Sequence, residues 1–314
     1  MFHDDKTLEM ARTFGQPIDP EANIPEVVSL VAEVDYAEPN EHDYYFDVLA
    51  ETKEVVTMDS TGQIVMQAVT PDTESALAFS DLATKEYYVK LAKLAANPEA
   101  VIARKRKTIA RALNREEAYR VVSVIDTAAT NAGNTVTLAS GTTKFTFGNV
   151  LEMVAQVKDY GKKLVLIAGT TVDNDIDGME YSENKYHSIR EQLTALGIEI
   201  KRVPFSVSRA AQSGATSTFI STEVVTKTKA YLVATDSEIG KPVLFVRRRL
   251  NAINLLGGLI TVDGEEAPER LVIVNANPRT VPGDAAYLGV GVIGYEQIAV
   301  VCRNQYACSY FNRA

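Results

Sequence analysis

The stretch from Glu33 to Ala95 constrains the fold most, because it favours extended structure that the chain cannot bury by itself. Runs rich in β-branched and aromatic residues lie at 44–48, 54–58 and 63–66, with a turn at 59–62. An isolated two-stranded ribbon is marginally stable in water, and its edges pair readily with other chains. We therefore expect a β-ribbon that lies on a neighbouring subunit. The side chains expected to make this contact are Tyr44, Phe46, Val55, Met58, Ile64 and Met66.

The composition is globular and disfavours a protein dedicated to nucleic acid. The 314 residues suffice for one large domain or two ordinary ones, and 46% of them are hydrophobic. The net charge of −9 argues against a dedicated nucleic-acid binder, because such proteins usually carry a basic face. Cys302 and Cys308 are too few for a disulfide framework and have the wrong spacing for a C-x-x-C pair, so we expect two free thiols.

Neither the first residues nor the apolar stretches of the sequence point to a membrane. The first residues are polar and acidic, unlike a signal peptide, and no apolar stretch is as long as a membrane span. We expect synthesis in a reducing cytosol and no membrane partner.

The N-terminal third contains an acidic arm and a long helix. Residues 1–32 are acidic and interrupted by three prolines, which is typical of an arm lying along something else. Asn97-Pro98-Glu99 predicts a helix start, with a cap, a proline at the first helical position and an acidic residue near the dipole. Apolar residues at helical spacing continue to Asn131, so an uninterrupted helix would be roughly 50 Å long. Asn114 marks a place where it could break.

The middle of the chain predicts an α/β unit. We expect a helix through Val157, a buried strand at 163–168, a helix at 183–196 and a strand at 198–205. The small polar residues at 206–217 favour a surface loop. From Ala230 onward the chain is mainly β, with strands at 230–233, 243–246, 271–274 and 297–302.

The segment 169–178 is the most suggestive local motif. Thr171-Val172-Asp173-Asn174-Asp175 resembles the Thr-Ile-Asp-Asn-Asp motif of the phosphofructokinase family, and this resemblance implies that Asp173 is a general base. The glycine-rich loops that would hold the nucleotide phosphates are missing from the sequence. Asp173 to Gly178 also begins like a calcium loop, but the twelfth position is Asn184 instead of glutamate. We prefer an acidic, solvated turn that caps the next helix.

Two basic runs, 104–107 and 247–249, have two interpretations each. They are solvated faces, or they contact acidic neighbouring subunits and packaged nucleic acid. The residues assigned to contacts between subunits are Arg104, Arg106, Arg247 and Arg249. The three histidines are scattered, no cluster has metal-ligand spacing, and no serine lies in a G-x-S-x-G motif. We therefore predict no catalytic residue, no metal and no cofactor.

The order of elements resembles the major capsid proteins of tailed bacteriophages, the Hong Kong 97 type. Gly240 to Arg247 is similar to the segment that leaves the axial domain in that family, and Tyr295 to Cys302 resembles its closing strand. The resemblance implies an α+β fold with an N-terminal arm at 1–32 and an extended β-hairpin loop at 33–80. It further implies a peripheral domain at 81–145 and 251–314, which contains a long spine helix, and an axial α/β domain at 146–250.

The same resemblance implies a function. It is that of a major capsid protein, without enzymatic activity, that self-assembles through hexamers and pentamers into the icosahedral shell of a virion. The implied partners are a portal, a decoration protein and weakly contacted double-stranded DNA. Because no long N-terminal helical extension is expected, the resemblance also implies a separate scaffolding protein, or else the short arm takes that role. Two alternatives stay open: an encapsulin-type nanocompartment shell, and a phosphofructokinase-like sugar phosphotransferase that rests on Asp173 alone.

Overall fold

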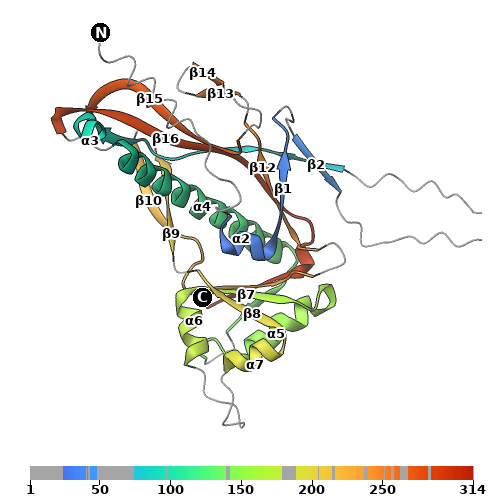
Figure 1. Cartoon of the computed structure of the whole chain (residues 1–314). Coiled ribbons are helices and arrows are strands. Elements are labelled where there is room, and N and C mark those ends of the chain that lie inside the picture. Colours follow the sequence, from blue (N-terminus) through green and yellow to red (C-terminus); the bar gives the residue numbers. More distant parts are fainter. Residues whose placement is uncertain are drawn as a thin grey trace, which may run out of the picture.

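The computed structural model of the chain is built around two β-sheets that share one long helix (Figure 1). It describes residues 24–39, 41, 43–47, 74–96, 98–138, 142–178, 189–203, 205–213, 216–236, 240–250, 252–255, 258–261, 268–281 and 284–313. Most of the ribbon tip, including Val55, Met58, Ile64 and Met66, lies outside these residues.

The larger sheet has six strands, with the order β1-β12-β16-β15 and with β4 and β5 also paired to β16. Its strands are β1 (Ala32–Ala37), β4 (Ser80–Ala83), β5 (Tyr87–Lys90), β12 (Val243–Arg248), β15 (Arg270–Val281) and β16 (Asp284–Cys302). β1 and β12 are parallel, whereas the other pairs are antiparallel. β16 is the long central strand: β4, β5, β12 and β15 pair with it directly, and β1 joins it through β12.

The smaller sheet has five strands in the order β6-β17-β11-β7-β8. Its strands are β6 (Thr135–Thr137), β7 (Leu164–Ala168), β8 (Ile198–Arg202), β11 (Lys229–Ala234) and β17 (Cys308–Asn312). The predicted strand at 163–168 is confirmed as β7, which is buried along its whole length. Leu164 and Leu166 face one core and Val165 and Ile167 face another, as expected for a strand covered on both faces.

The long helix is α4 (Pro98–Asn131), and it is continuous. The helix does not break at Asn114, where the sequence allowed a break. The Asn114 side chain accepts a hydrogen bond from Arg270 Nη1 at 2.7 Å, which joins the helix to β15. The C-terminal half of α4 packs Ala118 to Ala129 into a core shared by both sheets, and the N-terminal half packs Ile109 and Leu113 against the larger sheet. Figure 1 shows α4 running along the long strands β15 and β16.

The remaining helices cover the sheets. They are α2 (Glu26–Val31), α3 (Leu91–Ala96), α5 (Phe147–Val157), α6 (Thr170–Asp177) and α7 (Ile189–Ala195). α5 begins at a capping box in which the Thr146 hydroxyl accepts from the Asn149 backbone N–H. Its residues Val150, Met153 and Val157 recur at helical spacing and pack on the face of the smaller sheet that α4 does not cover. α7 begins at Ile189, so residues 183–188 of the predicted helix lie outside the described part.

Two predictions about local structure are wrong. The described part of the predicted loop at 206–217 is extended: β9 (Ser206–Ser213) pairs with β10 (Thr216–Glu223), since the β-branched threonines of β10 favour extended structure as much as small polar residues favour turns. Only part of the expected ribbon is a ribbon: β2 (Asp43–Asp47) pairs with β3 (Glu74–Ala78), while β1, β4 and β5 belong to the larger sheet.

The strand pairing also differs from the expected domain division at three strands. β12, which we grouped with 146–250, belongs to the larger sheet, whereas β6, which we grouped with 81–145, and β17, which we grouped with 251–314, belong to the smaller one. A short hairpin, β13 (Ala252–Leu255) with β14 (Gly258–Thr261), follows β12. The chain therefore passes from the smaller sheet to the larger one before Val243, and it returns to the smaller sheet between Cys302 and Cys308.

Candidate functional site: assembly surfaces and the joints behind them

The base of the ribbon presents one apolar face to its own sheet and one to the outside. Tyr44 and Phe46 of β2 are half-buried and pack, with Leu77 of β3, against Leu244 and other residues of the larger sheet. Tyr45 points the other way and is 63% exposed. Sequence reasoning missed Tyr45, although alternation along a strand separates it from Tyr44 and Phe46.

Tyr44 is tied into its own subunit by a hydrogen bond. Its hydroxyl donates to Asp35 Oδ2 of β1, and burial together with this carboxylate raises the pKa of Tyr44 to about 12. Tyr44 therefore ties the base of the ribbon to β1 of the larger sheet. The predicted contacts of Tyr44 and Phe46 with a neighbouring subunit stay predictions.

The basic run on α4 lies near its N-terminal end. Arg104 is exposed and Arg106 is half-buried, and burial lowers the pKa of Arg106. The Lys105 ammonium lies 5.3 Å from the centre of the Tyr87 ring, a cation–π distance. Burial and the neighbouring charge of Lys93 lower the pKa of Lys105. This end of α4 is a basic surface, and the contacts of Arg104 and Arg106 with another subunit stay predictions.

The second basic run divides between the core and the surface. Arg249 is 43% exposed in its side chain and pairs with Glu38 at 3.3 Å. The prediction that Arg247 contacts another subunit is wrong, because its side chain is wholly buried within this one. The apolar residues 243–246 before it are buried on both faces of β12, and Arg247 continues that buried strand.

Arg247 belongs to a buried ionic cluster that joins α4 to three strands. Glu117 of α4 accepts two hydrogen bonds from Arg247, at 2.8 Å to Nε and 2.9 Å to Nη2. The same carboxylate lies 2.7 Å from Arg270 Nη2, and Arg270 Nε donates to Glu296 at 2.6 Å. Glu269 completes the cluster, 3.5 Å from Arg247.

The cluster holds two arginines and three glutamates, so full ionisation would leave one excess negative charge in the core. Burial, and then the carboxylate of Glu117, raise the pKa of Glu296 to about 8. Its Oε1 atom has no hydrogen-bond partner among the described residues, which adds to the cost of ionising it. Burial opposes the charge of Arg247, but the carboxylates of Glu117, Glu296 and Glu269 together outweigh burial and raise the pKa of Arg247. No residue of this cluster other than Arg247 was singled out from the sequence.

A second joint ties α4 to the smaller sheet. Asp126 accepts hydrogen bonds at 2.9 Å from Lys229 Nζ and at 2.9 Å from the Tyr231 hydroxyl, both on β11. Burial, followed by the charge of Asp126, raises the pKa of Tyr231. Glu117 and Asp126 therefore attach one helix to both sheets.

The motif at 169–178 is a structural element instead of a solvated turn. It forms α6 directly after β7, and Asp173 is 2% exposed. Arg190 Nη2 donates to Asp173 at 2.6 Å and Arg202 lies 3.5 Å from it. The Asp173 carboxylate is buried and already held by two guanidinium groups, so a sugar hydroxyl has no access to it, which argues against the general-base hypothesis. A helix at this place is also unlike a calcium loop.

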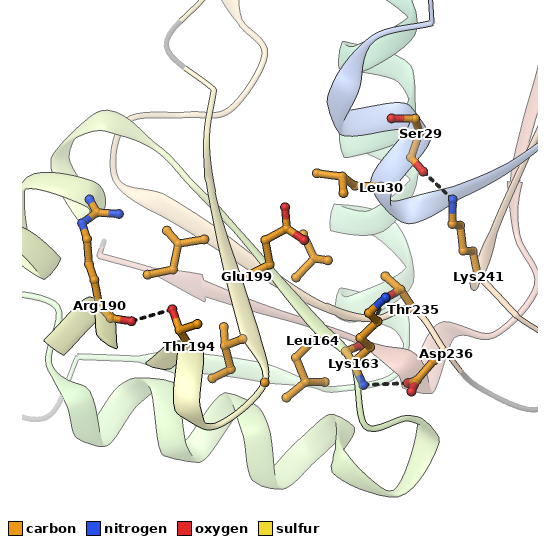
Figure 2. Close-up of a pocket in the computed structure, with 14 residues that line it drawn as sticks. Ser29, Leu30, Lys163, Leu164, Arg190, Thr194, Glu199, Thr235, Asp236 and Lys241 are labelled. Carbon is orange, nitrogen blue, oxygen red and sulfur yellow. Dashed lines mark hydrogen bonds between the residues drawn. The ribbon is translucent and has the colours of Figure 1, made fainter. Parts of the chain in front are cut away.

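An open cleft of about 830 Å³ lies between α2 and the strands β7 and β8 (Figure 2). Its lining mixes apolar residues with charged ones, and several polar groups already bond within the chain. The Lys241 ammonium donates to the backbone carbonyl of Ser29, and Asp236 accepts from the Lys163 backbone N–H at 2.7 Å. The Lys241 ammonium and the Asp236 carboxylate are therefore engaged within the chain and do not form a set of reacting groups in the cleft.

The described residues offer neither a cluster of metal ligands nor a membrane-spanning helix. None of these residues form a group of three or more histidine, cysteine or acidic side chains that could hold a metal ion. Within the same part of the chain, no helix is long and apolar enough to cross a membrane.

Comparison with known proteins identifies the fold. No protein-family model and no curated protein match the sequence. Among solved structures, the virus-like particle from Pyrococcus furiosus has a TM-score of 0.51 and 11% sequence identity, covering 99% of this chain and 100% of that one. A structure from Microbacterium phage Oxtober96 has a TM-score of 0.52 and 15% identity, covering 95% of this chain and 94% of that one. One from Mycobacterium phage Bobi has 0.51 and 13%, covering 98% of both chains.

The chain thus has an α+β fold of the Hong Kong 97-like capsid type, as the order of its elements predicted. The likeness to these solved structures extends over nearly the whole chain.

Proposed function

We propose that this chain is the major capsid protein of a tailed bacteriophage, and that copies of it form the icosahedral shell around a double-stranded DNA genome. The observation that carries the proposal is the capsid-type fold, shared with solved phage structures over nearly the full length of both chains. Asp173, which the phosphofructokinase resemblance suggested as a general base, is already paired with Arg190 and Arg202 and does not support a catalytic function. The chain acts by assembling, not by catalysis.

The ribbon supports self-assembly on physical grounds. Its base is a two-stranded antiparallel pair that leaves Tyr45 exposed. Two strands alone are marginal in water, so the ribbon gains stability when a neighbouring subunit covers it. Closed rings of five or six copies require head-to-tail contacts of this kind, in which one surface meets a different surface of the next copy.

The charge distribution supports a limited contact with DNA. The net charge is −9, which repels nucleic acid overall, while Arg104 and Lys107 are exposed on α4. Contacts from such residues to phosphates are weak and independent of sequence. The proposal also includes the usual partners of a phage shell: a scaffolding protein, a portal and a decoration protein. The location that follows is the virion, after assembly in the host cytoplasm.

A nanocompartment shell is the second candidate. The observation that favours it is the similarity to the virus-like particle from Pyrococcus furiosus, which covers 99% of this chain and 100% of that one. The two candidates share the subunit and its assembly, and they differ in what the shell encloses.

Electron microscopy of the expressed full-length chain tests assembly. We expect closed shells of uniform size, and a chain that stays a rigid monomer at high concentration, alone and with the scaffolding protein of its source, would refute the proposal. Particles purified from the producing cells then separate the two candidates. Nuclease-resistant double-stranded DNA indicates a phage capsid, whereas a co-packaged protein without DNA indicates a nanocompartment.

A matched pair of variants tests the ribbon surface. We expect Tyr45→Ser to reduce the yield of shells while the circular dichroism spectrum of the subunit stays unchanged, because the ring is 63% exposed in the isolated chain. Leu196→Ser, at an exposed position after α7, is the control for loss of an apolar surface group elsewhere. Equal yields from Tyr45→Ser and the unmodified chain would show that this face of the ribbon makes no contact.

A further inference from the structure

The two cysteines lie at opposite ends of the short link between the two sheets. β16 ends at Cys302, a 3-10 turn at Gln305–Ala307 follows, and β17 begins at Cys308. Cys302 pairs with Val243 in the larger sheet, and Cys308 pairs with Val233 in the smaller one. The two sulfur atoms are 4.0 Å apart.

The link that holds the sulfurs together is itself fixed. The Asn304 side chain caps the 3-10 turn by accepting from the Tyr306 backbone N–H at 3.1 Å. The Asn134 side chain, just after α4, donates to the backbone carbonyls of Tyr306 and Cys308 at 3.2 and 3.0 Å. The short distance between the thiols is therefore a property of a pinned turn with strands on both sides.

The two thiols are in unequal surroundings. Cys302 is partly exposed, whereas Cys308 is fully buried in the core shared by α4 and both sheets. The hydrogen bond from Cys308 lowers the pKa of Cys302, and the Asn304 backbone and the Arg303 charge add to this against the effect of burial. The same hydrogen bond, together with burial, raises the pKa of Cys308. The exposed thiol is thus the one that favours the nucleophilic thiolate form.

We propose that Cys302 is a redox modification site for low-molecular-weight disulfides, such as oxidised glutathione, and that Cys308 is its resolving thiol. The Cys302 thiolate attacks one sulfur of oxidised glutathione, whose S–S bond breaks and releases one glutathione thiolate. Cys308 gives its proton to water and attacks Cys302 Sγ, which releases the second glutathione thiolate. In sum, two protein thiols lose two electrons and two protons, and one oxidised glutathione is reduced to two thiols.

The geometry makes the second step intramolecular and short. The sulfurs need to approach from 4.0 Å to about 2.05 Å, the length of a disulfide bond. The bond would tie the end of β16 to the start of β17. This chemistry goes beyond the proposed function, because it depends on the folded subunit and not on whether the subunit assembles.

Intact-mass spectrometry and free-thiol titration of the full-length chain, incubated with oxidised glutathione, test the proposal. We expect the unmodified chain to lose both thiols and carry no bound glutathione. Cys308→Ser is expected to accumulate one stable glutathione on Cys302, and Cys302→Ser to react at least roughly tenfold more slowly, since Cys308 is buried. The same experiment on urea-unfolded chain is the control for reactivity that does not depend on the fold.

The experiment is decisive with the unmodified chain alone, so it does not depend on either variant folding. Retention of both thiols under conditions that oxidise the unfolded chain would overturn the proposal. So would a final product that still carries glutathione, because Cys308 would then not resolve the mixed disulfide.

Discussion

Replacing Glu117 by glutamine should destabilise the subunit strongly, because one carboxylate of α4 serves two buried arginines. Glu117 lies 2.8 Å from Arg247 and 2.7 Å from Arg270, and none of the three side chains is exposed. The glutamine keeps the size of the side chain and removes its charge. Both arginines then depend on Glu296 and Glu269 for compensation.

The expected magnitude follows from the burial and from the remaining carboxylates. Removing one partner of a buried ion pair typically costs about 3–5 kcal/mol. Here part of the loss is recovered, because the charge of Glu117 is one cause of the raised pKa of Glu296. Without Glu117, Glu296 ionises more readily and compensates Arg270. We therefore expect a loss near the lower limit, about 3 kcal/mol.

Thermal unfolding followed by circular dichroism measures this loss. For a chain of this length, about 3 kcal/mol lowers the melting temperature by roughly 5 °C. The matched control is Glu116→Gln, one residue away on α4, whose carboxylate pairs with Arg120 at 3.0 Å near the surface. That pair is worth about 0.5 kcal/mol or less, so the control should melt within about 1 °C of the unmodified chain.

The comparison of the two variants can refute the reasoning. If Glu117→Gln melts together with Glu116→Gln, the buried cluster does not hold α4 to the larger sheet. A much larger loss, with a chain that does not fold, would mean that Glu296 does not compensate.

Three other substitutions test separate parts of the structure. Because the pKa of Glu296 is raised from 4.5 to about 8, the folded chain retains a proton that the unfolded chain releases, and the free energy of unfolding should fall as pH rises over that interval. Urea unfolding at several pH values should therefore show a flatter profile for Glu296→Gln, and parallel profiles would contradict this assignment. Gly294→Ala would place a Cβ 2.2 Å from Ile109 Cγ2. We expect the free energy of unfolding in urea to fall by about 1–3 kcal/mol, and this loss should shrink in an Ile109→Ala background. Equal losses in both backgrounds would show that the two side chains do not clash. Gly169→Ala would place a Cβ 2.2 Å from the Thr226 backbone carbonyl, so a loss of at least about 1–3 kcal/mol is expected there, and an unchanged urea midpoint would count against this close approach.

The sequence predicted best where local patterns and burial agree. The 163–168 strand was recognisable because a β-branched and leucine run is apolar on both faces, and β7 is covered on both. The helix from Pro98 was recognisable from its start signal and spacing, and it continues to Asn131. Both features depend on neighbours in the sequence.

Features that depend on distant partners were missed. Two sequence signals meet at Arg247: the apolar strand before it indicates burial, and the run of three arginines that it begins indicates exposure. The pairing with Glu117, 130 residues away in the sequence, places Arg247 in the core. Asp173 looked solvated because its neighbours are acidic, whereas Arg190 and Arg202 come from α7 and β8. Likewise, the sequence spacing of the cysteines does not reveal the turn that sets their sulfurs 4.0 Å apart.

The two joints on α4 differ in strength, and this difference indicates which part of the subunit can yield first. Glu117 and its arginines have no exposure, so water cannot replace their bonds. Asp126 is 34% exposed and Lys229 24%, so water competes for this pair and its contribution is smaller. We therefore expect the smaller sheet to move more freely relative to α4 than the larger sheet does, which would let subunits take slightly different positions in the proposed shell. The Cys302–Cys308 pair spans the link from β16 to β17, one of the chain connections between those two sheets, so oxidation there would restrain the same movement.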